Sequence, residues 1–165
     1  MFKVTYAVKE NVIKSGSLNT NPSHSAWLAR FADCELIEVE TENNLFLAQD
    51  NLIYSGGQIV IDEAKLAERA EAQKQQDLKQ LEALAFAQQN KIIDQNMGQF
   101  LWDMFKRFDL SVCPIAKNYK DFLDALWLQY HTDKASLNFD VDYSTIVPAN
   151  EYSYQEIEAE YISNK

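Results

Sequence analysis

Apolar and polar residues alternate in short runs over residues 1–61. Alternation of this kind, rich in β-branched and aromatic side chains, is typical of strands with one buried face. The alternating runs lie at residues 2–8 and 34–40, and two short apolar runs follow at residues 52–54 and 58–61. Gly56 and Gly57 separate the last two runs and favour a hairpin, because glycine adopts positive φ without steric cost. We predict a small antiparallel β-rich domain over residues 1–61, with one short helix through Trp27.

The pattern becomes helical at Asp62. No glycine or proline occurs from Ala64 to Asn90, and nearly all residues between them are strong helix formers. The Asp62 carboxylate can accept hydrogen bonds from the free amides of the first turn, and Glu63 places negative charge at the positive end of the helix dipole. We predict a long amphipathic connecting helix over residues 62–97.

The large apolar residues of this predicted helix are concentrated in its second half. None occurs between Ala70 and Leu78, whereas Leu78, Leu81, Ala85 and Ile92 follow at intervals of 3, 4 and 7. We expect the first half to be solvated and stabilised mainly by helix propensity, and isolated helices of that kind are marginal. The second half must therefore pack against other helices of the protein or against a second copy.

Residues 98–165 are predicted to be mainly helical with an acidic end, which makes the fold class α+β. The most apolar helical stretch runs from Phe100 to Phe108. Asn118 is predicted to cap the next helix. Ser153, followed three residues later by Glu156, has the form of a capping box for a short final helix.

The net charge is −10, from 15 basic and 25 acidic residues. Residues 132–165 contain two basic and seven acidic residues, so half of the net charge (−5) lies in this last segment. A negative surface repels phosphate groups, and we therefore expect neither direct nucleic-acid binding nor docking to an anionic membrane. A basic protein partner is compatible with this charge.

Neither a secretory signal nor an apolar run long enough to span a membrane is recognisable in the sequence. The two cysteines, Cys34 and Cys113, are too few for a disulfide framework. A single bridge between them is the alternative to the interpretation that we favour, which is two buried thiols in a reducing compartment. We expect the protein in the cytoplasm of the cell that makes it.

The segment from Asp140 to Glu151 has oxygen-bearing residues at the ligand positions of a calcium loop. However, Thr145 occupies the position of the glycine that makes the sharp turn of such a loop, and Pro148 lies within the segment. We interpret it as an acidic loop rather than a metal site.

The sequence offers no recognisable catalytic constellation. Its histidines and cysteines form no closely spaced pair of zinc ligands, and no serine lies in a nucleophile elbow. Ser55-Gly56-Gly57 lacks the lysine and the helix that would follow in a phosphate-binding loop. We expect no catalytic residues, no cofactor, no metal and no enzyme activity.

The run from Leu52 to Leu66 (LIYSGGQIVIDEAKL), followed by a helix rich in Ala, Gln, Lys and Glu, resembles bacteriophage and prophage tail-associated proteins. Proteins of this tail-fibre assembly type often place a short β-hairpin just before a charged helix. The resemblance covers residues 50–90. It implies a non-enzymatic role in tail or fibre assembly, often as an oligomer, in the host cytoplasm or in the virion.

Two main hypotheses for the function follow, with an enzyme of unrecognised site as a third. The first is a structural or assembly protein whose partner is another protein or a second copy of itself. Its predicted contact residues are apolar and helical: Leu78, Leu81, Ile92, Phe100 and Phe108. The second is an acidic inhibitor that imitates nucleic acid and binds a basic host enzyme. Its predicted contact residues are Asp140, Asp142, Glu156, Glu158 and Glu160.

Overall fold

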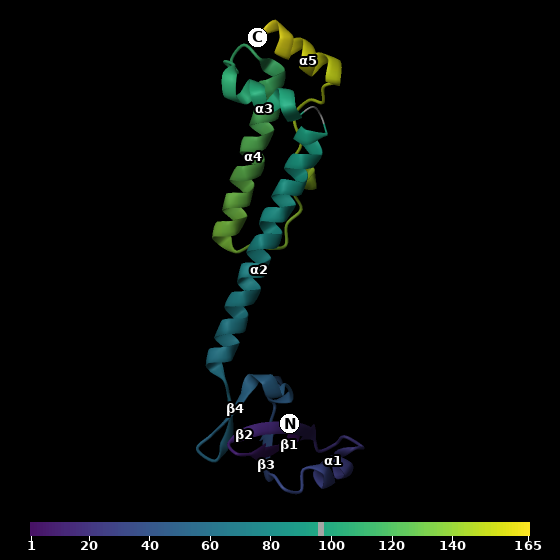
Figure 1. Ribbon diagram of the computed structural model, residues 1–165, viewed down its shortest axis with the longest axis vertical. Helices are drawn as coiled ribbons and strands as arrows, with labels where there is room; N and C mark the ends of the chain where they lie inside the picture. The colour runs from purple at the N-terminus through teal and green to yellow at the C-terminus, as the bar shows by residue number, and fades with distance from the viewer. Residues whose placement is uncertain (96–97) are drawn as a thin grey trace. The chain divides into compact units, whose positions relative to one another are not determined.

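The computed structural model of the chain describes residues 1–95 and 98–165 (Figure 1). Its contacts divide the chain into two compact units, Met1–Ala72 and Gln73–Lys165. The N-terminal unit contains all the strands, and the C-terminal unit is helical. The fold is therefore α+β, as predicted. Helix α2, Glu63–Gln89, begins in the N-terminal unit and ends in the C-terminal unit.

Strands of the N-terminal unit form two antiparallel sheets. They are β1 (Phe2–Lys9), β2 (Val12–Leu18), β3 (Glu35–Thr41), β4 (Leu52–Ser55) and β5 (Gln58–Ile61). β1 lies between β2 and β3. β4 and β5 form the predicted hairpin, with positive φ angles at Gly56 and Gly57. Helix α1, His24–Arg30, contains Trp27 as expected.

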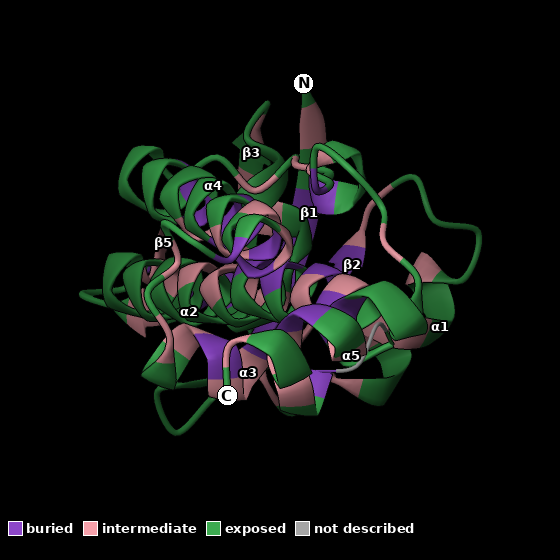
Figure 2. Ribbon diagram, turned by 90° about the horizontal axis from the view of Figure 1, so that it is seen from above, coloured by how far each residue is buried: buried purple, intermediate pink, exposed green. Residues whose placement is uncertain are grey.

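The central strand of the N-terminal unit is β1, whose residues 4–8 are all buried, so both of its faces are covered there. Figure 2 colours the buried residues of the chain purple. One face belongs to an apolar cluster whose buried members are Val4, Tyr6, Val8, Leu52 and Ile59. The other face carries Thr5 and Ala7, which are also buried. Helix α1 covers this second face, because the Trp27 indole donates a hydrogen bond to Ser15 Oγ at 2.9 Å and Ser15 pairs with Ala7.

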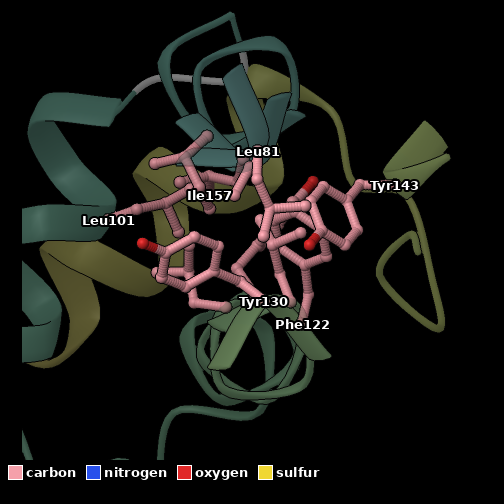
Figure 3. Close-up of a cluster of buried hydrophobic side chains, with 11 residues drawn as sticks. Leu81, Leu101, Phe122, Tyr130, Tyr143 and Ile157 are labelled. Carbon is pink, nitrogen blue, oxygen red and sulfur yellow. The ribbon is translucent and has the colours of Figure 1, made fainter. Parts of the chain in front are cut away.

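Helices α3 (Gly98–Arg107), α4 (Pro114–Ser136) and α5 (Tyr154–Ser163) build the C-terminal unit with the second half of α2. α4 runs alongside that half of α2 (Figure 1). Figure 3 shows the core, whose buried residues are Leu81, Ala85, Ile93, Leu101, Tyr119, Phe122, Leu123, Leu126, Tyr130, Tyr143 and Ile157. The apolar stripe predicted on α2 is thus covered by the protein's own helices.

Two of the predicted helix caps are confirmed and one is wrong. Asp62 Oδ1 accepts a hydrogen bond from the Lys65 amide at 3.1 Å, and Ser153 forms a capping box with Glu156. In contrast, α4 begins at Pro114 rather than after Asn118. Proline suits the first helical position because a free amide is not needed there, and its φ is already helical. Asn118 instead bonds the backbone of Asn150.

Short helical turns complete the chain. 3-10 turns lie at Asn44–Leu47, Gln49–Asn51 and Tyr143–Thr145. A π-helical turn, Asn90–Asp94, follows α2 within the predicted connecting helix, and the last two residues of that prediction, 96–97, lie outside the described residues. Within the ranges that the structure describes, no helix has the length and apolar character to cross a membrane.

Candidate protein-interaction surfaces

The apolar residues predicted to contact a partner lie largely inside the C-terminal unit. Leu81 is only 1% exposed, Ile92 packs against the same core, and Leu78 is partly buried. The ring centroids of Phe100 and Phe108 lie 4.8 and 5.7 Å, respectively, from the ring centroid of Tyr161 on α5. These side chains hold α2, α3 and α5 together, so none of them offers a largely exposed apolar surface.

The acidic residues predicted to imitate nucleic acid do not form one surface. Asp140 and Asp142 follow α4 and stay beside its last turns. Glu156, Glu158 and Glu160 lie on α5, which contacts the first turn of α4. The two ends of this 23-residue helix are roughly 30 Å apart at about 1.5 Å per residue. The two acidic groups are therefore separate features.

Glu160 has a structural role, because its carboxylate caps α4 from α5. Its two oxygens accept hydrogen bonds from the backbone amides of Ile115 and Ala116, each at 2.8 Å. The first amides of a helix have no partner within the helix, and Cys113 at the N-cap position provides no side-chain bond. Burial, with the Glu160 charge as a second cause, raises the pKa of the Cys113 thiol.

Two other acidic residues of the predicted set, Asp142 and Glu156, accept hydrogen bonds from backbone amides that are near them in the sequence. The amide of Ser144 donates to Asp142 at 2.8 Å, and the amide of Ser153 donates to Glu156 at 2.8 Å. These amide bonds favour the charged carboxylates and lower the pKa of both groups. Asp140 is exposed and Glu158 partly so.

A buried carboxylate that the sequence did not single out lies near the end of α4. Asp133 is 4% exposed and accepts hydrogen bonds from Gln129 Nε2 (3.1 Å), Asn138 Nδ2 (3.0 Å) and the Tyr143 hydroxyl (3.2 Å). Burial, followed by the Asp133 charge, raises the pKa of Tyr143 to about 12. The tyrosine therefore stays a donor at neutral pH. The cluster fastens the segment after α4 to that helix.

Among residues 1–95 and 98–165, no three histidine, cysteine, aspartate or glutamate side chains gather as metal ligands do. The Asp142 carboxylate, within the segment considered for calcium, bonds both the amide and the hydroxyl of Ser144. Both cysteines are free thiols. Cys113 is buried as expected, whereas Cys34 is only partly buried.

An exposed apolar surface lies where α2 and α4 run side by side. The Phe86 ring meets the Trp127 ring edge-on, with centroids 4.9 Å apart, and the Trp127 indole donates to Gln89 Oε1 at 2.9 Å. Phe86 is 44% exposed, and Leu128, the residue after Trp127 on α4, is 70% exposed. His131 continues this surface one turn further along α4. We refer to Phe86, Trp127, Leu128 and His131 as the α2–α4 ledge.

A second candidate surface is a groove of about 440 Å³ in the N-terminal unit. Its lining comes from β3, β5 and the turn before β5: Ile37, Glu38, Val39, Glu40, Gly57, Gln58 and Ile59. β3 pairs only with β1, and β5 only with β4, in the part of the chain that the structure covers. The groove therefore lies between two strand edges that are not bonded to each other. We refer to it as the β3–β5 groove.

Sequence reasoning missed both surfaces for physical reasons. Phe86 follows Leu81 by five residues, which places it about 140° around the helix from the buried stripe. That phase was a usable signal for an exposed aromatic residue. Nothing local in the sequence indicates that the edges of β3 and β5 face each other. No family model, curated protein or solved structure matches this chain.

Proposed function

We propose that this chain is a non-enzymatic structural or assembly protein of phage type, which acts through protein–protein contacts and associates with a second copy of itself. The observation that supports the proposal most is the α2–α4 ledge. Exposed apolar surfaces that join several large side chains often mark interaction sites, and aromatic residues are enriched in the centres of protein interfaces.

The charge around the ledge is compatible with self-association. Residues 111–131, which include most of α4, contain two lysines and two aspartates and have no net charge. Their ion pairs, Lys117 with Asp121 and Lys120 with Asp124, lie within α4. The remainder of the chain has a net charge of −10. Two copies that meet through α4 would therefore bring together the segment with the least like-charge repulsion.

The hairpin and helix on which the phage resemblance rests also support this proposal. β4 and β5 form that hairpin, and α2 begins two residues after β5. The inhibitor hypothesis has less support, because its carboxylates lie near opposite ends of α4 and Glu160 is used as a helix cap. We therefore retain the assembly role as the conclusion.

The test is the molar mass in solution, measured by analytical ultracentrifugation from micromolar to near-millimolar protein. We expect concentration-dependent association that Leu128→Lys weakens about tenfold or more, because a charge would be buried at the contact. Ile162→Lys is the matched control, since Ile162 is 65% exposed on α5 and away from the ledge. Substitution of Leu81 is unsuitable, because that residue supports the core.

A wild-type protein that stays monomeric at every concentration would contradict the proposal. Association that Ile162→Lys weakens as much as Leu128→Lys would assign the contact to another surface and overturn the role of the ledge. Circular dichroism of both variants establishes that each one is folded, so that a loss of association is not a loss of structure.

A further inference from the structure

The β3–β5 groove has free backbone groups on both of its sides. A strand at the edge of a sheet presents a row of amides and carbonyls that an additional strand can bond. The other outer edge of the larger sheet, that of β2, is partly covered, because the Gln49 side chain donates to the Ile13 carbonyl at 2.8 Å. β3 is seven residues long, and no side chain in the described part of the chain bonds its outer backbone edge in this way. The edge of β3 is thus the more accessible one.

Side chains along β3 alternate between two environments, as strand geometry requires. Ile37 and Val39 pack against the apolar cluster of the N-terminal unit, which includes Ile59 of β5. Glu38 and Glu40 point to the opposite face of the sheet. A strand added beside β3 would therefore place every second side chain next to apolar residues and the others next to glutamates.

The charge of the groove discriminates between possible occupants. Its lining contains two glutamates and neither lysine nor arginine. Glu38 forms an ion pair with Lys3 at 3.3 Å, while Glu40 is exposed and forms no ion pair or hydrogen bond within residues 1–95 and 98–165. Antiparallel pairing with β3 of a second copy would bring glutamates close to glutamates, which is unfavourable across strands. The complementary occupant is a basic strand.

We propose that the β3–β5 groove binds an extended segment of a partner protein, in which apolar residues alternate with lysine or arginine and which adds a strand to the free edge of β3. This mode of recognition combines backbone hydrogen bonds for affinity with alternate side-chain contacts for specificity. The inference rests on the proposed function in that it assumes a protein-binding role. It uses a different surface from the ledge, in the other unit.

The probe is a capped synthetic peptide of seven residues in which lysine and valine alternate. Binding to the full-length protein is measured by isothermal titration at low and at high salt. We expect this peptide to bind, and to bind at least about tenfold more tightly than a peptide of the same composition with its lysines and valines in two blocks. A peptide with alternating glutamate and valine should not bind. High salt should weaken the binding, because exposed charges are screened.

Two protein variants separate the groove from general attraction to an acidic surface. Glu40→Lys should weaken binding of the alternating peptide about fivefold or more, because it removes one ion pair and adds a repulsion. Glu151→Lys changes an exposed acidic residue of the C-terminal unit by the same charge and should leave the affinity within about twofold. Leu128→Lys should also leave it unchanged, so the result does not depend on the ledge.

Amide hydrogen exchange identifies the bonded edge. At saturating peptide, we expect slower exchange in residues 35–41 of β3 and unchanged exchange in β2. Equal affinity for the blocked and alternating peptides would overturn the proposal, as would protection of β2 instead of β3 or a lack of binding at near-millimolar peptide. Loss of self-association through the ledge would affect only the proposed function, because the two experiments use different residues and readouts.

Discussion

The two units bury their polar groups in different ways. In the N-terminal unit the buried polar side chains are neutral, namely Thr5, Ser17 and Asn51. In the C-terminal unit they include two carboxylates, Asp133 and Glu160. The strands of the N-terminal unit are joined largely by backbone hydrogen bonds. In the C-terminal unit, side chains hold α5 and the segment after α4 against α4. A carboxylate suits that task because it accepts several hydrogen bonds at once.

The same contrast distinguishes the two candidate surfaces. The β3–β5 groove offers strand edges and glutamates. The α2–α4 ledge offers aromatic and aliphatic side chains, and all of its residues except Phe86 lie in the segment 111–131, which has no net charge. We therefore expect salt to weaken binding at the groove much more than association through the ledge. Acidic residues in this chain therefore have two roles. Some fix the helical unit internally, and others define an outward-facing strand edge.

The largest effect is expected for Leu81→Ala, which tests how one face of α2 supports the C-terminal core. Leu81 is 1% exposed, and loss of its side chain should lower the free energy of unfolding by about 3 kcal/mol. Leu84→Ala is the matched control on the same helix, since Leu84 is 46% exposed and should cost less than about 1 kcal/mol. Urea unfolding measures both values.

Hydrogen exchange then assigns the effect of Leu81→Ala to a unit. Amides of α4 should exchange faster, while those of β1 should change little, because Leu81 belongs to the core of the C-terminal unit. Equal losses of stability for the two leucine variants would mean that this face of α2 is not the buried one, and would contradict the described packing.

Much of the fold follows from patterns that are local in the sequence. The alternation in residues 2–8 predicts β1, and Gly56 with Gly57 predicts the hairpin, because the strand period and glycine conformation are properties of a few neighbouring residues. The cap at Asp62 and the capping box at Ser153 are predictable for the same reason. The apolar stripe through Leu81 is also a local pattern in the sequence, whereas the helices that cover it come from distant parts of the chain.

The candidate sites depend on residues that are distant in sequence, and local patterns predict these sites wrongly or not at all. Glu160 is an acidic residue on a short helix, and only the approach of α5 to Ile115 makes it a cap for α4. The side chain of Asn118 makes it the predicted cap, but Pro114, four residues earlier, already starts the helix. The β3–β5 groove requires knowledge of which strand edges remain unpaired. Such information lies in tertiary contacts and not in sequence periodicity.

The next effect concerns the N-terminal unit at high pH. Tyr6 is 1% exposed, its hydroxyl donates to the Phe46 carbonyl, and burial raises its pKa from 10.0 to about 12. A raised pKa in the folded state means that the neutral form is favoured there. Its contribution to stability is complete below pH 10 and is lost as the pH rises through about 12. The loss should be roughly 2–3 kcal/mol, at about 1.4 kcal/mol per pKa unit.

Urea unfolding at pH 10 and at pH 12, compared between wild type and Tyr6→Phe, measures this effect. The variant lacks the ionisable group and should lose less stability between the two pH values. Tyr143 of the C-terminal unit also has a pKa raised to about 12, so the variant should keep part of the alkaline sensitivity. A Tyr6→Phe protein with the same pH dependence as wild type would show that the N-terminal unit does not hold a neutral tyrosine in its core.

The smallest of these effects tests whether a buried carboxylate distinguishes the C-terminal unit. Glu160→Gln keeps the shape of the side chain but leaves one oxygen where two amides need acceptors. The free energy of unfolding should fall by about 2 kcal/mol, as expected for lost hydrogen bonds to a charged group. Glu158→Gln is the matched control two residues earlier on α5 and should change stability by less than about 0.5 kcal/mol. Similar values for both variants would mean that the Glu160 carboxylate is not needed as a cap, and that the first turn of α4 is stabilised by Pro114 and solvent instead. It would also remove the main structural objection to Glu160 as a partner-binding residue, so this measurement bears on the function as well as on the fold.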